Sequence, residues 1–186
     1  MIEKQAKRWT YEEYYKLDDG QRYEIIDGDL LMAPSPDVWH QDWNGNLYFL
    51  LRQHLAKRKA GRLFIAPFDV VLDSENTVQP DLIFVAAANK GIIEKRAIFG
   101  APDLLVELLS SSSIRRDRHL KKALYARFGV KEYWIGDPAN KAMEILTLRD
   151  GSYQRHCAAT EKGKLVSKIL PGLELDLADI QSLPDT

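Results

Sequence analysis

The 186-residue chain has the length and composition of one globular domain. Apolar residues make up 45% of it and charged residues 28%, which is enough for a packed core and ordinary for a soluble protein. The formal net charge is −1, which excludes a protein that attracts nucleic acid through its overall field, so such a contact requires a local basic patch. The single cysteine, Cys157, excludes an internal disulfide and a cysteine metal cluster.

The distribution of apolar residues bears on where the protein is located. Residues 1–10 are mostly polar and lack the apolar core of a signal peptide. The apolar runs of the chain are shorter than a membrane-spanning helix requires. We therefore expect a cytoplasmic protein that does not associate with a membrane.

A short helix and a hairpin are the first elements that the sequence predicts. Thr10 and Glu13 have the spacing of a capping box, which favours a helix over residues 11–17. Residues 23–26 and 30–32 are apolar runs on either side of the dipeptide Asp27-Gly28, which favours a tight β-turn. This pattern predicts a β-hairpin.

A long helix is predicted next. Apolar residues recur at intervals of three and four and therefore share one helical face: Trp39, Trp43, Leu47, Leu50, Leu51 and Leu55. The turn at residues 35–37 precedes this pattern, and Gly61 has the position of a C-terminal cap. We expect one helix between the turn at residues 35–37 and Gly61.

Beyond Gly61 the pattern changes to that of strands. Short β-rich or apolar runs predict strands at residues 62–65, 69–72, 82–85, 104–109 and 131–135. Helical spacing returns over residues 117–128, and residues 142–148 and 152–158 form a second predicted hairpin around Asp150-Gly151. Mixed strands with one long early helix and one later helix predict a layered α/β or α+β fold.

Two acidic residues interrupt runs that are otherwise apolar. Asp81 follows Pro80 and directly precedes the run 82–85, whereas Glu107 lies inside the run 104–109. Burying a carboxylate in a strand costs free energy unless it is paired or binds a cation. The patterning leaves other interpretations open: Asp81 as a turn residue after proline, and Glu107 as the partner of an arginine or a residue on an exposed strand face.

The segment 115–131 concentrates positive charge. Asp117, Lys121 and Tyr125 follow one another at intervals of four and share a face of an α-helix, where an Asp–Lys pair is weakly stabilising. One acid, Asp117, stands against the basic residues Arg115, Arg116, Arg118, Lys121, Lys122, Arg127 and Lys131. In a chain of net charge −1 this segment is the best candidate for a phosphate-contacting patch, with a solvated helix face as the alternative.

The ordered set of motifs resembles the Uma-type family of restriction-endonuclease-like proteins, over about residues 10–180. The motifs that carry the resemblance are YEIIDG (23–28), residues 34–41, QPDL (79–82), PDLLVE (102–107) and residues 117–135. This family is assigned to the PD-(D/E)XK nuclease superfamily. The resemblance therefore implies an α/β fold with a mixed central sheet flanked by helices and additional β-hairpins, in a single nuclease-like domain over residues 1–186.

The resemblance also implies roles for individual residues. Asp81 and Glu107 match the acids that hold a catalytic Mg²⁺ or Mn²⁺, and Glu24 matches an upstream catalytic acid of the family. The position two after Glu107 is Leu109, where the superfamily carries a lysine. The family supplies its lysine from the following helix, where the matching position is Lys121.

The implied activity is metal-dependent phosphodiester hydrolysis by a DNA endonuclease. Arg115, Arg116, Arg118 and Lys122 are the residues that we expect to contact the nucleic acid. We expect a homodimer, because restriction-like folds often cut both strands by pairing two sites. Two alternatives stay open: an enzyme that hydrolyses a smaller phosphate ester, and a weakly active or inactive nuclease fold that binds nucleic acid or another protein.

Overall fold

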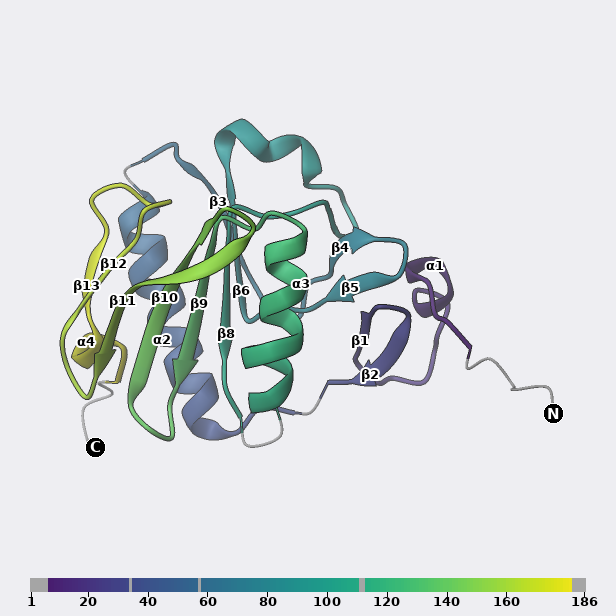
Figure 1. Cartoon of the computed structure of the whole chain (residues 1–186), viewed down its shortest axis with the longest axis horizontal. Helices are drawn as coiled ribbons and strands as arrows, with labels where there is room; N and C mark the ends of the chain where they lie inside the picture. Colours follow the sequence, from purple (N-terminus) through teal and green to yellow (C-terminus); the bar gives the residue numbers. More distant parts are fainter. Residues whose placement is uncertain (1–6, 34, 57, 111–112, 182–186) are drawn as a thin grey trace.

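The computed structural model describes residues 7–33, 35–56, 58–110 and 113–181 (Figure 1). Its helical segments are α1 (Tyr11–Tyr14), α2 (Val38–Ala56), the 3₁₀ segment η1 (Ala87–Ile92), the π-helical segment η2 (Arg116–Lys121), α3 (Lys122–Arg127) and α4 (Leu177–Gln181). Its strands are β1 (Tyr23–Ile26), β2 (Asp29–Met32), β3 (Gly61–Ile65), β4 (Val70–Asp73), β5 (Asn76–Val78), β6 (Leu82–Ala86), β7 (Ile98–Phe99), β8 (Leu104–Leu108), β9 (Glu132–Asp137), β10 (Ala142–Arg149), β11 (Ser152–Thr160), β12 (Lys164–Val166) and β13 (Glu174–Asp176).

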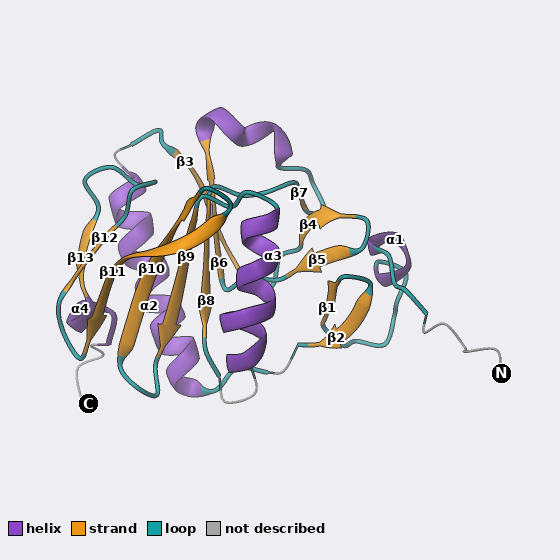
Figure 2. Cartoon of the chain, viewed as in Figure 1, coloured by secondary structure: helices purple, strands orange, loops and turns teal. Residues whose placement is uncertain are grey.

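A six-stranded sheet in the order β11-β10-β9-β8-β6-β3 forms the centre of the structure. Strands β8 and β9 run parallel, and the other neighbouring pairs are antiparallel. Figure 2 shows α2 on one face of this sheet and α3 on the other. The predicted α/β class, with a mixed central sheet flanked by helices, is confirmed.

Each face of the central sheet has its own apolar core. The core on the α2 side joins the helix residues Trp43, Leu47, Leu51 and Leu55 to the strand residues Leu82, Phe84, Leu104, Val106 and Leu108. The core on the α3 side contains Ile83, Val85, Leu105, Leu109, Leu124, Tyr125 and Tyr133. Strands buried on both faces need apolar residues at every position, which explains why β6 and β8 read as continuous apolar runs.

A second sheet, in the order β2-β1-β5-β4-β7, lies beside the central one. Its β1–β2 hairpin turns at Asp27 (φ 50°) and Gly28 (φ 80°), and the β10–β11 hairpin turns at Asp150 (φ 48°) and Gly151 (φ 76°). Two successive residues with positive φ make the tight turn whose twist matches paired strands. Both hairpins predicted from an Asp-Gly pair are confirmed.

Three local predictions were wrong in detail. The first helix ends at Tyr14 rather than at residue 17, and α2 ends at Ala56, so that Gly61 begins β3 instead of capping a helix. Gly61 is required there for a different reason: a Cβ on it would lie 2.2 Å from the backbone oxygen of Val85 on the paired strand β6. Trp39 is 67% exposed because α2 enters the core only from its second turn.

The chain between residues 117 and 128 is helical, but its first part is not an α-helix. It begins as the π-helical segment η2 and continues as α3. A π-helical turn contains an extra residue and is often found at functional sites. In the part of the chain that the structure describes, no helix is both long and apolar enough to cross a membrane.

Replacing Gly61 with Ala is expected to lower the free energy of unfolding by about 1–3 kcal/mol, the usual cost of forcing an extra carbon into a packed structure. The new Cβ would meet backbone atoms of β6, which cannot move aside without breaking the strand pairing. Urea denaturation measures the change. Gly91→Ala is the matched control, because a Cβ there meets no atom within 4 Å and should leave stability nearly unchanged.

Candidate active site

Asp81 and Glu107 lie on the same face of the central sheet. Side chains alternate between the two faces of a strand, so Glu107 shares the face of Leu105 and Leu109, which is covered by α3. The antiparallel register Leu82↔Val106 makes Asp81 the cross-strand neighbour of Glu107. The backbone N–H of Leu108 donates a hydrogen bond to Oδ2 of Asp81 at 2.7 Å, which fixes that carboxylate beside the strand.

Lys121 joins three acids that come from three different elements. Its Nζ lies 2.8 Å from Oε1 of Glu24 on β1, 2.8 Å from Oε1 of Glu107 on β8, and 3.5 Å from Oδ1 of Asp117 in η2. All four side chains are buried, with Lys121 3% exposed. Tyr125 completes the group by donating its hydroxyl hydrogen to Oε1 of Glu107 at 2.6 Å.

The predicted face of Asp117, Lys121 and Tyr125 is therefore present, although η2 is π-helical rather than α-helical. The lysine that turns toward Glu107 is Lys121, whereas Lys122 is half-buried and outside the ion-pair cluster. Leu109, the position where a lysine is absent, packs in the apolar core against α3 instead. The ammonium group thus reaches Glu107 from the helix that covers the sheet.

Opposing effects set the protonation of this cluster. Burial lowers the pKa of Lys121, but the charges of Glu107 and Glu24 outweigh burial and raise it above the ordinary value, so the ammonium stays protonated. Burial raises the pKa of Glu24, but Lys121 and Arg116 outweigh it and leave that pKa below its ordinary value. Glu24 is also held by the backbone N–H of Gln79, which donates to Oε1 at 2.9 Å.

Glu107 behaves differently from Glu24. Burial raises its pKa well above the ordinary value, Lys121 opposes this, and the neighbouring acids Asp117, Asp81 and Glu24 reinforce it. The single positive charge of Lys121 cannot neutralise all of these carboxylates. Glu107 is therefore the acid whose negative charge is least compensated, and it would gain most from an additional cation.

His40, near the start of α2, contacts Asp81 from the other side. Its Nε2 lies 3.2 Å from Oδ2 of Asp81, and the ring is buried. Burial lowers the pKa of His40, but the hydrogen bond and charge of Asp81 outweigh it and raise the pKa. This contact joins α2, on one face of the sheet, directly to Asp81, which immediately precedes β6.

These groups line one cavity of about 390 Å³. Its wall is formed by side chains from both sheets, from α2 and from η2, and its polar members include Arg22, Glu24, His40, Gln41, Asn44, Gln79, Asp81, Glu107, Arg116, Asp117 and Lys121. Segments far apart in sequence therefore converge on a single space. A ligand in that space would contact acids and bases at the same time.

The residues present fit a divalent cation held by few protein ligands. No group of three or more His, Cys, Asp or Glu side chains is arranged to hold a metal ion within the described residues. Mg²⁺, however, binds proteins through one or two carboxylates and keeps several waters. Leu108 and His40 contact Oδ2 of Asp81, and Lys121 and Tyr125 contact Oε1 of Glu107. Four buried or half-buried acids line the cavity together with the basic side chains Arg22, His40, Arg116 and Lys121.

The basic segment is less positive than its sequence indicates. Arg118 lies 2.7 Å from Glu144 and 3.7 Å from Asp137, and Lys131 lies 2.6 Å from Asp103. Arg127 pairs in the same way with an acid of the β1–β2 turn. The concentration of charge in residues 115–131 is thus partly neutralised by acids that are distant in the sequence.

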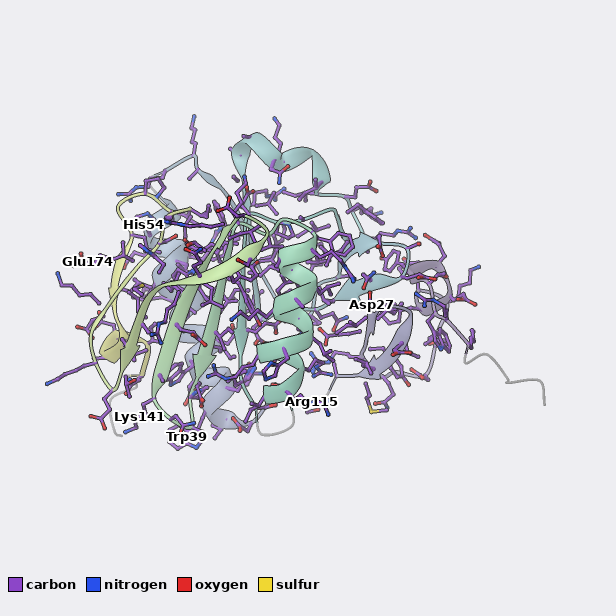
Figure 3. The ribbon with its side chains drawn as sticks, in the orientation of Figure 1. Asp27, Trp39, His54, Arg115, Lys141 and Glu174 are labelled. Atoms are coloured by element: carbon purple, nitrogen blue, oxygen red, sulfur yellow. The ribbon has the colours of Figure 1, made fainter. Side chains whose placement is uncertain are left out.

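The four residues expected to contact nucleic acid take different positions. Arg115 is exposed, and Figure 3 shows it at the lower end of the helix formed by η2 and α3. Arg116 lines the cavity, with Nε 3.5 Å from Oε2 of Glu24. Lys122 is half-buried, and Arg118 is paired as described above. Arg115 and Arg116 are therefore the members of the set best placed to meet a phosphate.

Sequence patterns did not predict the contact between His40 and Asp81. The four histidines show no metal-ligand spacing, and nothing local indicates that the start of α2 meets the start of β6. One signal was present, because His40 lies within the 34–41 motif that contributes to the family resemblance. Asp69, which immediately precedes β4, accepts hydrogen bonds from Gln79 and Tyr14 and does not line the cavity.

A mixed sheet with helices on both faces and an acid–lysine cluster beside its central strands defines a restriction-endonuclease-like α/β fold. Residues 11–178 match the Uma2 family, which is described as "Putative restriction endonuclease". The chain therefore belongs to the Uma2 family.

Comparison with solved structures supports the fold. A crystal structure from Anabaena variabilis, described as that of a "putative nuclease belonging to DUF820", superposes with a TM-score of 0.75 at 16% sequence identity. The match covers 92% of this chain and 97% of the other. A comparison with curated proteins gives no match.

Replacing Glu107 with Gln is expected to stabilise the metal-free protein, and more so at pH 8 than at pH 5. A carboxyl whose pKa is raised by folding contributes stability below its unfolded pKa and loses it as the pH rises through the folded pKa. The amide resembles the protonated carboxyl but does not titrate. Urea denaturation in EDTA at the two pH values measures the difference.

Glu132→Gln is the matched control for that experiment. Glu132 is also fully buried, but it accepts hydrogen bonds from Trp134, Ser167 and the backbone of Lys168. Its replacement should destabilise the protein by about 1–3 kcal/mol, because a buried acceptor is lost. Destabilisation by Glu107→Gln of similar size would show that Glu107 is an ordinary structural acid.

Proposed function

We propose that the protein is a metal-dependent nuclease that hydrolyses phosphodiester bonds, with DNA as its substrate. The observation that carries the proposal is the buried Lys121, which lies 2.8 Å from Glu107 and from Glu24 at the wall of a cavity that also contains Asp81. Stability by itself does not favour so many buried charges. Membership of the Uma2 family, described as a restriction endonuclease family, supports the same conclusion.

Asp81 and Glu107 would hold the divalent cation, Mg²⁺ or Mn²⁺. Both are carboxylates, the ligand type that these ions prefer, and both line the cavity on the same sheet face. A cation bound there stabilises negative charge on phosphoryl oxygens and makes a bound water more acidic. Its positive charge would also offset the excess of carboxylates around Glu107.

Lys121 would act through its charge rather than as a base. Because its pKa is raised by Glu107 and Glu24 in spite of burial, the ammonium has no free electron pair with which to accept a proton. It can donate hydrogen bonds to the attacking water and stabilise the charge that develops in the transition state. Glu24 would position Lys121, since the contact between the two is direct.

The substrate would enter the cavity past Arg115 and Arg116, at the start of η2. Arg116 lines the cavity and Arg115 is exposed beside it, so both can reach the phosphate backbone. Lys122 and Arg118 would add weaker, more distant contacts. Nucleic acid is therefore the proposed partner. We also propose that the protein is cytoplasmic and does not act at a membrane.

A non-catalytic function is the second candidate. Two observations favour it: the described residues contain no cluster of three metal-binding side chains, and Leu109 replaces the lysine of the superfamily motif. Such a protein would bind nucleic acid or another protein through the same cavity and basic residues. Metal dependence distinguishes the two candidates, because binding without catalysis need not respond to a divalent cation.

Mg²⁺ or Mn²⁺ is expected to be required for cleavage of plasmid DNA, and EDTA should abolish it. Asp81→Asn and Glu107→Gln should each remove activity while leaving the circular dichroism spectrum unchanged, since removing one of several mutually repelling carboxylates does not disturb folding. Cleavage in EDTA, or activity retained by both variants, would contradict the metal-site assignment.

Lys121 and Lys122 provide a matched pair for testing the catalytic lysine. Lys121→Ala should lower the rate by about 10²-fold or more, the range seen when one preorganised charged group is lost. Lys122→Ala should mainly weaken DNA binding in a salt-dependent way, because its side chain lies outside the ion-pair cluster. Single-turnover rates and binding at several salt concentrations separate these effects, with folding checked by circular dichroism. Equal rates for the two variants would count against Lys121.

We also propose that the protein acts as a homodimer, since restriction-like folds often cut both strands by pairing two sites and a two-fold dimer is the commonest oligomer.

A further inference from the structure

The outer face of α2 carries a line of residues that belong to no apolar core cluster formed by the described residues. The inner face packs in the core against the central sheet. On the opposite face residues recur at alternating intervals of four and three: Val38, Asp42, Gly45, Phe49, Arg52 and Ala56. This is the spacing of the contact line between two packed helices.

The apolar members of this line are open to solvent. Val38 is 64% exposed and Phe49 is 62% exposed, although both belong to a helix whose other side is fully buried. Single exposed apolar residues are common on protein surfaces. Trp39, 67% exposed, lies beside the line at the start of α2, near the lower edge of the molecule in Figure 3. The alignment of Val38 and Phe49 on one helical face, with Trp39 beside them, indicates a contact surface.

Gly45, at the centre of the line, is not required by packing against the described residues. It lies in the interior of α2, where glycine costs about 1 kcal/mol relative to alanine. A Cβ on it would meet no atom within 4 Å. Internal packing therefore does not require a glycine, whereas a second helix that approaches closely at this point would.

The line is complementary to itself about its midpoint, Leu47. Asp42 and Arg52 lie five residues on either side of Leu47, Gly45 and Phe49 lie two residues on either side, and Val38 and Ala56 lie nine. In an antiparallel copy of α2 related by a two-fold axis at the level of Leu47, Asp42 would therefore face Arg52 of the other copy. The ring of Phe49 would face the space over Gly45, and Val38 would face Ala56. The described structure pairs neither Asp42 nor Arg52 with another charged group of the chain.

We propose that two copies of this chain associate through the outer faces of their α2 helices. Phe49 of each copy fills the space over the partner's Gly45, and Asp42 of each copy pairs with the partner's Arg52. This isologous contact requires only one surface patch, as a two-fold dimer does. It gives the dimer proposed above a defined surface, and it does not depend on hydrolysis, because assembly and cleavage are measured separately.

Charge reversal at the predicted pair tests this interface. Sedimentation velocity over a concentration series should show wild-type protein at twice the chain mass of 21.3 kDa. Asp42→Arg and Arg52→Asp should each weaken the dimer by about tenfold or more, because like charges then face each other across the axis. The double variant D42R/R52D should recover most of the affinity, since opposite charges again face each other.

Two features make the result decisive. Both reversals oppose the helix dipole, so the double variant has the least favourable isolated helix, and its recovery cannot arise from helix stability. Lys90→Glu, on the exposed segment η1, is the control for a change of net charge and should leave the dimer unaffected. A monomeric wild-type protein, single variants that dimerise normally, or a double variant no stronger than the singles would each overturn the proposal.

Discussion

The buried ammonium group of Lys121 is the constraint on which the site depends. An unpaired charge in a protein interior costs several kcal/mol, so Lys121 at 3% exposure requires carboxylates around it. These arrive from β1, β8 and η2, three segments that are distant in sequence. The second sheet, the central sheet and the covering helix must therefore be docked correctly before the charge is compensated. The site is therefore complete only when these three elements have packed together.

The compensation is incomplete, and this is where stability and function diverge. Lys121 satisfies Glu24, whose pKa falls, but leaves Glu107 with a pKa well above the ordinary value because burial and three other acids act on it. Strongly shifted pKa values of buried acids that line a cavity are typical of functional sites rather than of residues that serve stability alone.

Helix α2 connects this site with the surface. Its inner face carries His40 to Asp81 and fills the core behind the central sheet, while its outer face presents the self-complementary line around Gly45. A second copy docked on that line would contact the same rigid helix that supports Asp81. The dimer contact and the contact of His40 with Asp81 would then share α2, which would allow the dimer to influence the geometry of the site.

The sequence by itself determined the features that depend on neighbouring residues. Asp-Gly pairs specify the two hairpins because only local backbone geometry is involved, and the apolar periodicity locates α2. The sequence also identified Asp81 and Glu107 as candidates. Strands that are buried on both faces of a sheet consist mainly of apolar residues, so a carboxylate next to or within such a strand stands out in the pattern.

The roles expected of Glu24 and Lys121 rest on the family resemblance, since nothing local relates residues that are 97 positions apart in the sequence. Only the tertiary structure decided that Lys121 touches three acids, that His40 reaches Asp81, and that Glu144 and Asp137 neutralise Arg118. It also ended α2 early and placed Gly61 in a strand, where Val85 leaves no space for a Cβ. Each of these depends on contacts between segments brought together by sheet packing, and a pattern along the chain carries no information about which distant side chain will occupy the facing position.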